Sequence, residues 1–590
     1  MDIKIPHEKS YKFIKNLNSS KERIDSIAII DGDYTCTYKE MFKNWEDYAK
    51  AFSALGITEK NNSCALVFST ATKESINIFY ALNMTGAVCS FAEPHLDFGR
   101  VESIKKVIKV EKTTDLIIWD WAFTVDIIKQ LVEAKEELGL RNIIIFHTEF
   151  PQLFSKVFLK PLNFRIKSKV KKIKGVIWLD EAIEKYSNHA IEYGSDDDSK
   201  LTLITHTSGT LKGIRKPVAF TDRNINALAT EFMESKFSLP MKNPKSLFFI
   251  PPCTAYGAVN SMHLPLAMNC AVISLHLIFP MPKLFGKVLK TYKPNVILSN
   301  CYFWDYVMES KEAKKLDLSE LAYVGIGGSK IPPKKLKEYN KFLAEHGSKI
   351  YVTNGYGLSE AGGASIITVT KSENDSIGVP LPGVYVKVYD QDTNSYKGLS
   401  DAPVSGELFI SSEAAVSGKL YENKILDPVL LDGRMYIPTG DSVRFETDGT
   451  ITYIGRLGRA FQYFDQRNCQ PELIEDDIKK VKGVKNCLVV PKYYSDKKGK
   501  LTLIYFEFDK SVKDEKKLIH DIIYYIFLSG TSIEVPQSLP KECVVVDEIP
   551  LNIMSKEEVH DIIEHGLEGK KFRIKKVGRI PYIKDIIIKE

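Results

Sequence analysis

The sequence predicts an α/β protein with a large N-terminal domain and a small C-terminal α+β domain. Three observations support this. Helical patterns alternate with short apolar runs over residues 1 to about 200, which is typical of parallel strands with crossover helices. From about Pro380, short strands are separated by Gly, Asp and Asn, which indicates a β-rich subdomain. After Arg456 a second, smaller pattern begins, and 590 residues are too many for one core.

The elements of the N-terminal domain follow from the spacing of its apolar residues. Residues Tyr38–Leu55 have the period of an amphipathic helix. Short runs rich in Val, Ile and Leu have the length and composition of buried parallel strands. We expect such strands at Ser63–Phe68, Leu116–Trp119, Ser246–Ile250, Ala271–Ser274, Val296–Ser299, Leu321–Ile326 and Lys349–Val352.

The later elements are shorter and closer together. Strands of the β-rich part are expected at Val384–Tyr389, Gly406–Ile410 and Thr450–Ile454. In the C-terminal part we expect helices near 472–480 and 515–527 and strands near 488–490 and 501–508. The predicted domains are therefore 1–456, with the β-rich subdomain at about 380–456, and 457–590.

Composition excludes several classes of protein. Hydrophobic residues make up 44% of the chain and charged residues 26%, which excludes a disordered or fibrous chain. The net charge of +6 results from 81 basic and 75 acidic residues, a balance that does not indicate a nucleic-acid partner. Nine cysteines without a C-x-x-C pair indicate neither a disulfide framework nor a zinc site. We find no transmembrane segment and no apolar leader, and expect a cytoplasmic protein.

One stretch is strongly basic and contains no acidic residue. The plainer interpretation is a solvated surface; weak contact with a membrane surface or with an acidic carrier protein is the alternative. Its basic residues are Lys156, Lys160, Arg165, Lys167, Lys169, Lys171, Lys172 and Lys174.

A segment rich in hydroxyls, glycines and cations follows the alternating stretch Leu201–Thr205. It reads Thr207-Ser208-Gly209-Thr210-Leu211-Lys212-Gly213-Ile214-Arg215-Lys216. Glycines let backbone N–H groups approach an anion, hydroxyls add donors, and cations neutralise a polyphosphate. The segment is therefore a candidate phosphate-binding loop, although an ordinary surface loop has a similar composition.

Three further segments follow in a particular order. They are Asn354–Glu360 (NGYGLSE), Tyr436–Asp441 (YIPTGD) with Gly455-Arg456, and Pro550–Lys556 (PLNIMSK). Together with the phosphate segment they resemble the core motifs of the class I adenylate-forming (AMP-binding) enzymes, the superfamily of acyl-CoA synthetases, luciferases and nonribosomal peptide synthetase adenylation domains. The resemblance implies an N-terminal adenylation domain and a mobile C-terminal lid domain.

The resemblance also implies roles for the phosphate segment. Thr207, Ser208, Gly209, Thr210 and Gly213 would surround the β- and γ-phosphates of ATP, and Lys212 and Lys216 would add positive charge. The family usually has T-S-G-T-T-G-x-P-K-G. This chain has one residue more before its second glycine, which shifts the register of the lysine by one residue. It also has Arg215 in place of the family's proline and Pro217 in place of the final glycine.

The two middle segments would hold the nucleoside and the metal. Glu360, with Thr207, would bind Mg²⁺, and the hydroxyl of Ser359 would keep the donor of the family's threonine. Tyr356 would stack on the adenine, and Asp441 would accept hydrogen bonds from both ribose hydroxyls. The remaining residues expected around the nucleotide are Gly328, Asn354, Gly355, Gly357 and Arg456.

The last segment and its approach differ most from the family. Lys556 would bridge the attacking carboxylate and the α-phosphate, although Ser555 stands where the family has glycine. Gly458 occupies the hinge position, which is usually Asp or Lys. The following stretch 462–471 lacks the glycine of the family's hairpin, and a bulky residue there would obstruct a pantetheine arm.

These resemblances predict an ATP-dependent acid–thiol ligase that uses ATP, Mg²⁺ and coenzyme A. It would activate a small carboxylic acid, fatty or aryl, as acyl-AMP and then transfer the acyl group to CoA. Loading of a carrier-protein phosphopantetheine is the alternative within enzymes, and basic residues at 156–174 and 570–576 suit either acceptor. A nucleotide-binding protein that has lost turnover is the alternative of another class.

Overall fold

The computed structural model divides the chain into two compact units. Residues 1–207 and 217–455 form the first unit, and residues 208–216 and 456–590 form the second. The structure describes residues 3–92, 101–148, 168, 170–211, 214–235, 239, 241–275, 282–328, 331, 333–371, 376–390, 393–416, 419–420, 423–424, 428–456, 461–462, 468–469, 471–479, 481–495, 499–524, 540–549, 566–577 and 580–585.

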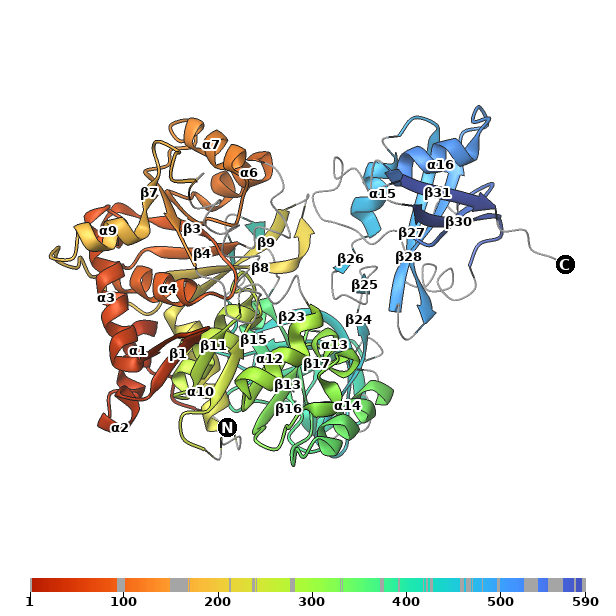
Figure 1. Cartoon of the computed structure of the whole chain (residues 1–590). Coiled ribbons are helices and arrows are strands. Elements are labelled where there is room, and N and C mark those ends of the chain that lie inside the picture. Colours follow the sequence, from red (N-terminus) through yellow and green to blue (C-terminus); the bar gives the residue numbers. More distant parts are fainter. Residues whose placement is uncertain are drawn as a thin grey trace. The chain divides into compact units, whose positions relative to one another are not determined.

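Seven strands form a mostly parallel sheet, counted over the described residues. Its order is β7-β6-β5-β3-β4-β8-β9, and β3, β5 and β6 are buried along their whole length. Figure 1 shows α6 and α7 on one face of this sheet and α3 and α4 on the other. The strands are β3 Cys64–Phe68, β4 Val88–Ala92, β5 Asp115–Trp119, β6 Asn142–Phe146, β7 Ile177–Trp178, β8 Leu201–Leu211 and β9 Ile214–Thr221.

The helices of this layer begin at recognisable caps. At the predicted helix, now α3, Thr37 and Glu40 form a capping box, and the helix runs over Tyr38–Ala54. Every residue of α4 after Lys73 is buried, because the helix is packed on both sides. The helices are α3 Tyr38–Ala54, α4 Lys73–Thr85, α6 Val101–Glu111, α7 Val125–Glu133 and α9 Leu179–Lys185.

The larger sheet joins a parallel and an antiparallel part and has 15 strands among the described residues. Its parallel part has the order β14-β13-β12-β10-β11-β1, and the hairpin strand β2 lies at its edge. The expected strands Ala271–Ser274 and Val296–Ser299 are confirmed as β11 and β12. The others are β1 Ile27–Asp31, β2 Tyr34–Thr37, β10 Lys245–Phe248, β13 Tyr323–Ile326 and β14 Thr353–Leu358.

The antiparallel part of this sheet is the β-rich region expected after Pro380. Its order is β18-β17-β19-β23-β24-β16-β15, and β15 pairs with β14 of the parallel part. The strands are β15 Gly363–Ile367, β16 Ser376–Pro380, β17 Tyr385–Asp390, β18 Ser395–Lys397, β19 Val404–Ser411, β22 Val429–Leu431, β23 Arg434–Phe445 and β24 Ile451–Arg456.

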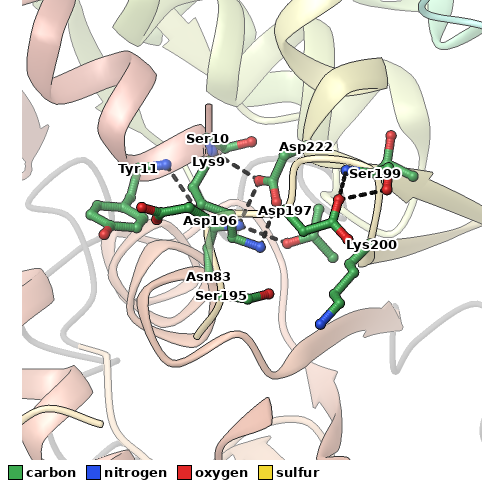
Figure 2. Close-up of polar contacts among 12 residues, drawn as sticks. Lys9, Ser10, Tyr11, Asn83, Ser195, Asp196, Asp197, Ser199, Lys200 and Asp222 are labelled. Atoms are coloured by element: carbon green, nitrogen blue, oxygen red, sulfur yellow. Dashed lines mark hydrogen bonds and ion pairs between the residues drawn. The ribbon is translucent and has the colours of Figure 1, made fainter. Parts of the chain in front are cut away.

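An N-terminal helix is anchored to the first unit by a buried polar network. Lys9 forms an ion pair with Asp222 (2.7 Å), and both side chains are buried. Asn83 donates to Asp222 (2.6 Å) and accepts the N–H of Tyr11 (2.9 Å), as Figure 2 shows. This network joins α1 (Ser10–Leu17) to α4 and to α10 (Asp222–Glu234). Loss of one partner would leave a buried charge unpaired, which is strongly destabilising.

The second unit has its own sheet and core. Five strands in the order β27-β28-β29-β30-β31 pack against α15 and α16 through a cluster of buried apolar residues, including Ile504, Phe506 and Ile519. The predicted helices and strands of this part are confirmed in place. Their bounds are α15 Pro471–Lys479, β27 Val484–Ser495, β28 Gly499–Phe508, α16 Glu515–Ile523, β29 Glu542–Val545, β30 Lys570–Val577 and β31 Ile580–Asp585.

None of the helices in the described part of the chain combines the length and apolar character needed to cross a bilayer. Within the same ranges no cysteine forms a disulfide, and eight of the nine are buried. Cys253 is 2% exposed and thus behaves as a small buried residue.

A buried acid on α10 predicts a pH dependence of stability. Burial raises the pKa of Glu231 to about 8, the nearby Glu413 adds to this, and the hydrogen bond from Ser412 opposes it. A pKa raised in the folded state stabilises the fold below the unfolded value near 4.5, and this contribution is lost as pH rises through about 8.

We therefore expect Glu231→Gln, which stays neutral, to gain in Tm relative to the wild type between pH 5.5 and pH 9. The difference in Tm is measured by thermal unfolding at several pH values, with Glu234→Gln on the exposed face of the same helix as the control. A Tm difference that does not change with pH would contradict the buried neutral acid.

Candidate active site

The backbone of the phosphate segment forms strands and not the expected loop. Thr207, Ser208, Gly209 and Thr210 continue β8, and Lys216 lies on β9, its neighbour in the sheet. The expectation of a loop was wrong because β-branched threonines continue the alternation of the preceding strand, and backbone pairing outweighs the turn-forming residues. The side chains of this hairpin, with Lys212 and Gly213, lie outside the described residues.

The second segment is itself a strand. Residues 353–358 form β14, so the strand expected at Lys349–Val352 begins several residues later than predicted. A Cβ on Gly357 would lie 1.6 Å from the carbonyl oxygen of Gly363 on β15, so only glycine fits this close pairing. Four of the residues expected at the nucleotide, Asn354, Gly355, Tyr356 and Gly357, therefore share one strand.

Asn354 is engaged within the sheet. Its amide nitrogen donates to the carbonyl of Ser376 (3.2 Å), and its N–H donates to the hydroxyl of Thr368 (2.8 Å). The side chain thus ties β14 to β16, and the backbone N–H contacts Thr368, which follows β15. This contact orients the strand that carries Tyr356.

Ser359 and Glu360 lie in a short turn directly after β14. The turn is a 3-10 helix over Ser359–Ala361, closed by Gly362 at a φ of 83°. Both side chains are partly exposed, and a carboxylate is the ligand type that Mg²⁺ prefers. Among the described residues no group of three or more His, Cys, Asp or Glu side chains could hold a metal.

Asp441 receives hydrogen bonds from two tyrosines. The hydroxyl of Tyr356 donates to its Oδ2 (2.8 Å), and that of Tyr453 on β24 donates to its Oδ1 (3.3 Å). The two rings lie 6.1 Å apart at 42°. Asp441 is 6% exposed. We call these three residues the Asp441 cluster.

Asp441 lies in a bulge of β23. The register of β23 against β19 shifts between Glu407 and Phe409, so that Thr439, Gly440 and Asp441 together lie opposite Leu408. Extra residues on one strand of a pair redirect its side chains. Gly440 has a φ of 69°, and its N–H donates to Glu407 (3.2 Å). The hydroxyl of Thr439 accepts the N–H of Asp441 (3.1 Å). In the Thr-Gly-Asp sequence, glycine thus permits the left-handed backbone, threonine accepts the N–H of the aspartate, and aspartate supplies the carboxylate.

The cluster has the chemistry needed to bind a diol. Burial, more than the neighbouring carboxylate of Asp441, raises the pKa of Tyr356 well above its usual value, so the phenol remains a donor at neutral pH. A carboxylate is an acceptor with two oxygens, so the chemistry of Asp441 suits the vicinal hydroxyls of a diol, each of which donates a hydrogen bond.

An apolar region adjoins β14. A Cβ on Gly327 would lie 3.2 Å from the carbonyl oxygen of Gly355 and 3.6 Å from the ring of Tyr256. The hydroxyl of Tyr256 donates to the carbonyl of Ser299 (3.1 Å), and its ring packs on Val296, Leu298 and Tyr323. Gly328 follows at a φ of 82°. These residues could form one wall of an apolar acid pocket.

Tyr256 begins the π-helix η2, which runs over Tyr256–His263. A Cβ on Gly257 would lie 2.0 Å from the carbonyl oxygen of Pro251, so this helix packs directly on the preceding turn. Thr254 accepts the N–H of Gly257 (3.0 Å) and donates to Pro251 (3.1 Å). Such wide helical turns occur frequently at functional sites.

The remaining site predictions fall mostly outside the described residues. Arg456 ends β24, but its side chain is not described, and Gly458 and Lys556 lie outside the described ranges. The hairpin expected after the hinge is present as β25 (Phe461–Gln462) paired with β26 (Asn468–Cys469). In the basic stretch, Lys171 pairs with Glu181 (3.4 Å) and lies over the ring of Trp178.

Sequence reasoning missed Tyr453 and Glu407. Glu407 lies on β19 and Tyr453 on β24, and on a strand each looks like an ordinary sheet residue. The only available signal was the position of Tyr453 three residues before Arg456. Its contact with Asp441 depends on a neighbouring strand and could not be inferred from spacing.

A sequence model of the AMP-binding enzymes matches residues 18–419. The chain belongs to this family of adenylate-forming enzymes. This AMP-binding enzyme is 27% identical over 333 residues to the luciferin 4-monooxygenase of Photuris pensylvanica, which covers 52% of this chain and 57% of the relative. It is 29% identical over 206 residues to a putative acyl-CoA ligase, YdaB, of Bacillus subtilis, covering 35% and 39%. The matches thus span about half the length of these relatives.

Solved structures show the same fold. The amide bond synthetase McbA of Marinactinospora thermotolerans superposes with a TM-score of 0.71 at 15% identity, covering 94% of this chain and 99% of that one. A long-chain-fatty-acid-CoA ligase (FadD1) of Archaeoglobus fulgidus gives a TM-score of 0.65 at 14% identity, covering 92% and 98%. The α/β fold class expected from the sequence is confirmed.

The tyrosine–aspartate contact predicts a measurable effect on ATP use. We expect Tyr356→Phe, which keeps the ring and removes the hydroxyl, to raise the KM for MgATP about 10-fold with little change in kcat, since a hydrogen bond to a charged group contributes about 1.5–3 kcal/mol. Pyrophosphate release measures both constants. Tyr389→Phe, whose hydroxyl contacts Asn394 on the surface, is the control. A KM equal to that of the control would contradict the contact's role.

Proposed function

We propose that this AMP-binding enzyme is an acid–thiol ligase. It activates a carboxylic acid, fatty or aryl, as acyl-AMP with release of pyrophosphate, and then transfers the acyl group to coenzyme A. The observation that carries the proposal is the Asp441 cluster. A carboxylate that two tyrosine hydroxyls contact suits a nucleoside, and Tyr356 lies on the strand that leads directly into the Glu360 turn.

The chain's own residues would contribute mainly position and charge. Asp441 would hold the ribose hydroxyls, and Tyr356 and Tyr453 would hold Asp441 and flank the base. Thr207–Thr210, Gly213, Lys212 and Lys216 would hold the phosphates, with Gly328, Gly355, Gly357 and Arg456 bordering the nucleotide. Displacement of pyrophosphate by a carboxylate brings two anions together, so catalysis depends on cations aimed at the phosphoryl oxygens.

Glu360 and Thr207 would hold Mg²⁺, and Ser359 would support the same turn. When bound, the ion would neutralise charge on the phosphates. Lys556 would be placed by rotation of the 457–590 domain about Gly458, and its ammonium would contact the carboxylate and the α-phosphate. The apolar surface of Tyr256, Val296 and Leu298 favours an apolar acid.

The test is pyrophosphate release from MgATP with short, medium, long and aromatic acids, with and without CoA. Release that requires one class of acid and yields acyl-CoA supports the ligase and identifies its substrate. Release without acyl-CoA points to a carrier-protein thiol, whose loading is then assayed with acidic carrier proteins. Binding of ATP with no release for any acid supports a nucleotide-binding protein without turnover.

A further inference from the structure

The turn that carries Glu360 rests on a segment from the β-rich part. The N–H of Val416 donates to the carbonyl oxygen of Glu360 (2.9 Å). A Cβ on Gly362 would lie 2.9 Å from the carbonyl oxygen of Ala414, so the two backbones are in close contact. We call Ser412–Val416 the supporting segment. The Glu360 turn thus packs directly on this segment.

The supporting segment is held from its other side by the first turn of α10. The amide of Asn224 donates to the carbonyls of Glu413 (2.8 Å) and Ala415 (3.2 Å). Arg223 pairs with Glu413 (2.8 Å) in a half-exposed contact, which contributes little to stability. The hydrogen bonds from the Asn224 side chain to these two carbonyls therefore attach the segment here.

A buried acid makes the third contact. The hydroxyl of Ser412 donates to Glu231 Oε1 (2.5 Å) and accepts the N–H of Ala414 (2.8 Å). Glu231 is 1% exposed, and its Oε2 has no hydrogen-bond partner among the described residues. Burial of a carboxyl group with one hydrogen bond is costly. A buried polar group that lacks partners calls for an explanation, and for Glu231 the segment that it holds in place provides one.

We propose that Glu231 is a positioning residue for Glu360. Glu231 holds Ser412, and Ser412 orders the supporting segment. This segment in turn fixes the position of the Glu360 turn. The inference rests on the proposed function, in which Glu360 holds Mg²⁺. Glu231 lies 181 residues from Ser412 in the sequence, so the contact exists only in the folded chain.

The proposal is tested with Glu231→Ala, Ser412→Ala and Glu231→Gln in the full-length chain. We expect the first two to raise the free Mg²⁺ concentration at half-maximal pyrophosphate release about 5-fold, in the range of couplings carried through packed segments. The KM for the acid should stay within about 2-fold of the wild type. Glu231→Gln keeps an acceptor for Ser412, so it should restore most of the Mg²⁺ response.

A second readout does not depend on turnover. The rise in Tm with Mg²⁺ in the presence of a non-hydrolysable ATP analogue should require higher Mg²⁺ in Glu231→Ala and Ser412→Ala. Glu234→Ala on the exposed face of α10 is the matched control. Equal Mg²⁺ dependence of both variants and the control would overturn the proposal.

Glu360→Gln separates this inference from the proposed function. If Glu360→Gln shifts the Mg²⁺ dependence and the Glu231 and Ser412 variants do not, the positioning role is wrong and the metal role of Glu360 stands. If Glu360→Gln itself has no effect, the metal role fails, and with it the reason for the positioning role. A shift in all three, reversed by Glu231→Gln, supports both.

Discussion

Replacement of Asp441 by alanine should lower kcat/KM for MgATP by about 100- to 1,000-fold. The variant would lack the two charge-assisted hydrogen bonds that the carboxylate accepts from the ribose in the proposed function, each contributing about 1.5–3 kcal/mol. The hydroxyls of Tyr356 and Tyr453 would also lose their acceptor. Asp441→Asn keeps the shape and one oxygen acceptor but not the charge, so its loss should be smaller.

The ribose contact is isolated by pairing this variant with altered nucleotides. The wild type should use ATP much better than 2′-deoxyATP or 3′-deoxyATP, and Asp441→Ala should discriminate weakly, because the two changes remove the same interaction. Asp401→Ala, an exposed carboxylate that caps a loop in the β-rich part, controls for a general loss of charge. Undiminished discrimination in Asp441→Ala would show that another group holds the ribose.

Replacement of Lys556 by alanine should slow formation of acyl-AMP by about 100-fold or more, the usual effect of removing one donor aimed at developing charge. Reaction of preformed acyl-AMP with the thiol should change little, because the proposed contact belongs to the first half reaction. Acid-dependent exchange of labelled pyrophosphate into ATP measures the first step, and consumption of added acyl-AMP measures the second.

Two further variants make this result specific. Lys556→Arg keeps the charge with a different geometry and should recover only part of the rate. Lys510→Ala removes an exposed lysine of the second unit and should leave both half reactions unchanged. Equal slowing of both half reactions in Lys556→Ala would contradict a role confined to adenylation.

Sequence patterns located elements best where burial is uniform. Buried parallel strands appear as continuous apolar runs, so β11 and β12 were predicted with their observed bounds. The glycine-containing β14 and the Thr-rich end of β8 were not predicted as strands. Their composition is that of turns, and strand pairing is what extends them: β14 pairs with β13 and β15, and β8 pairs with β9.

For this protein the sequence by itself determined the α/β class, the order of the four motif segments and the family to which they belong, because these depend on local composition and linear order. Only the tertiary structure decided that Tyr453, like Tyr356, donates a hydrogen bond to Asp441. It also decided that Glu231 contacts Ser412 of the supporting segment. Each of these contacts joins residues on different elements. Strand pairing, a bulge in β23 and helix packing bring them together, and neither spacing nor residue type encodes that proximity.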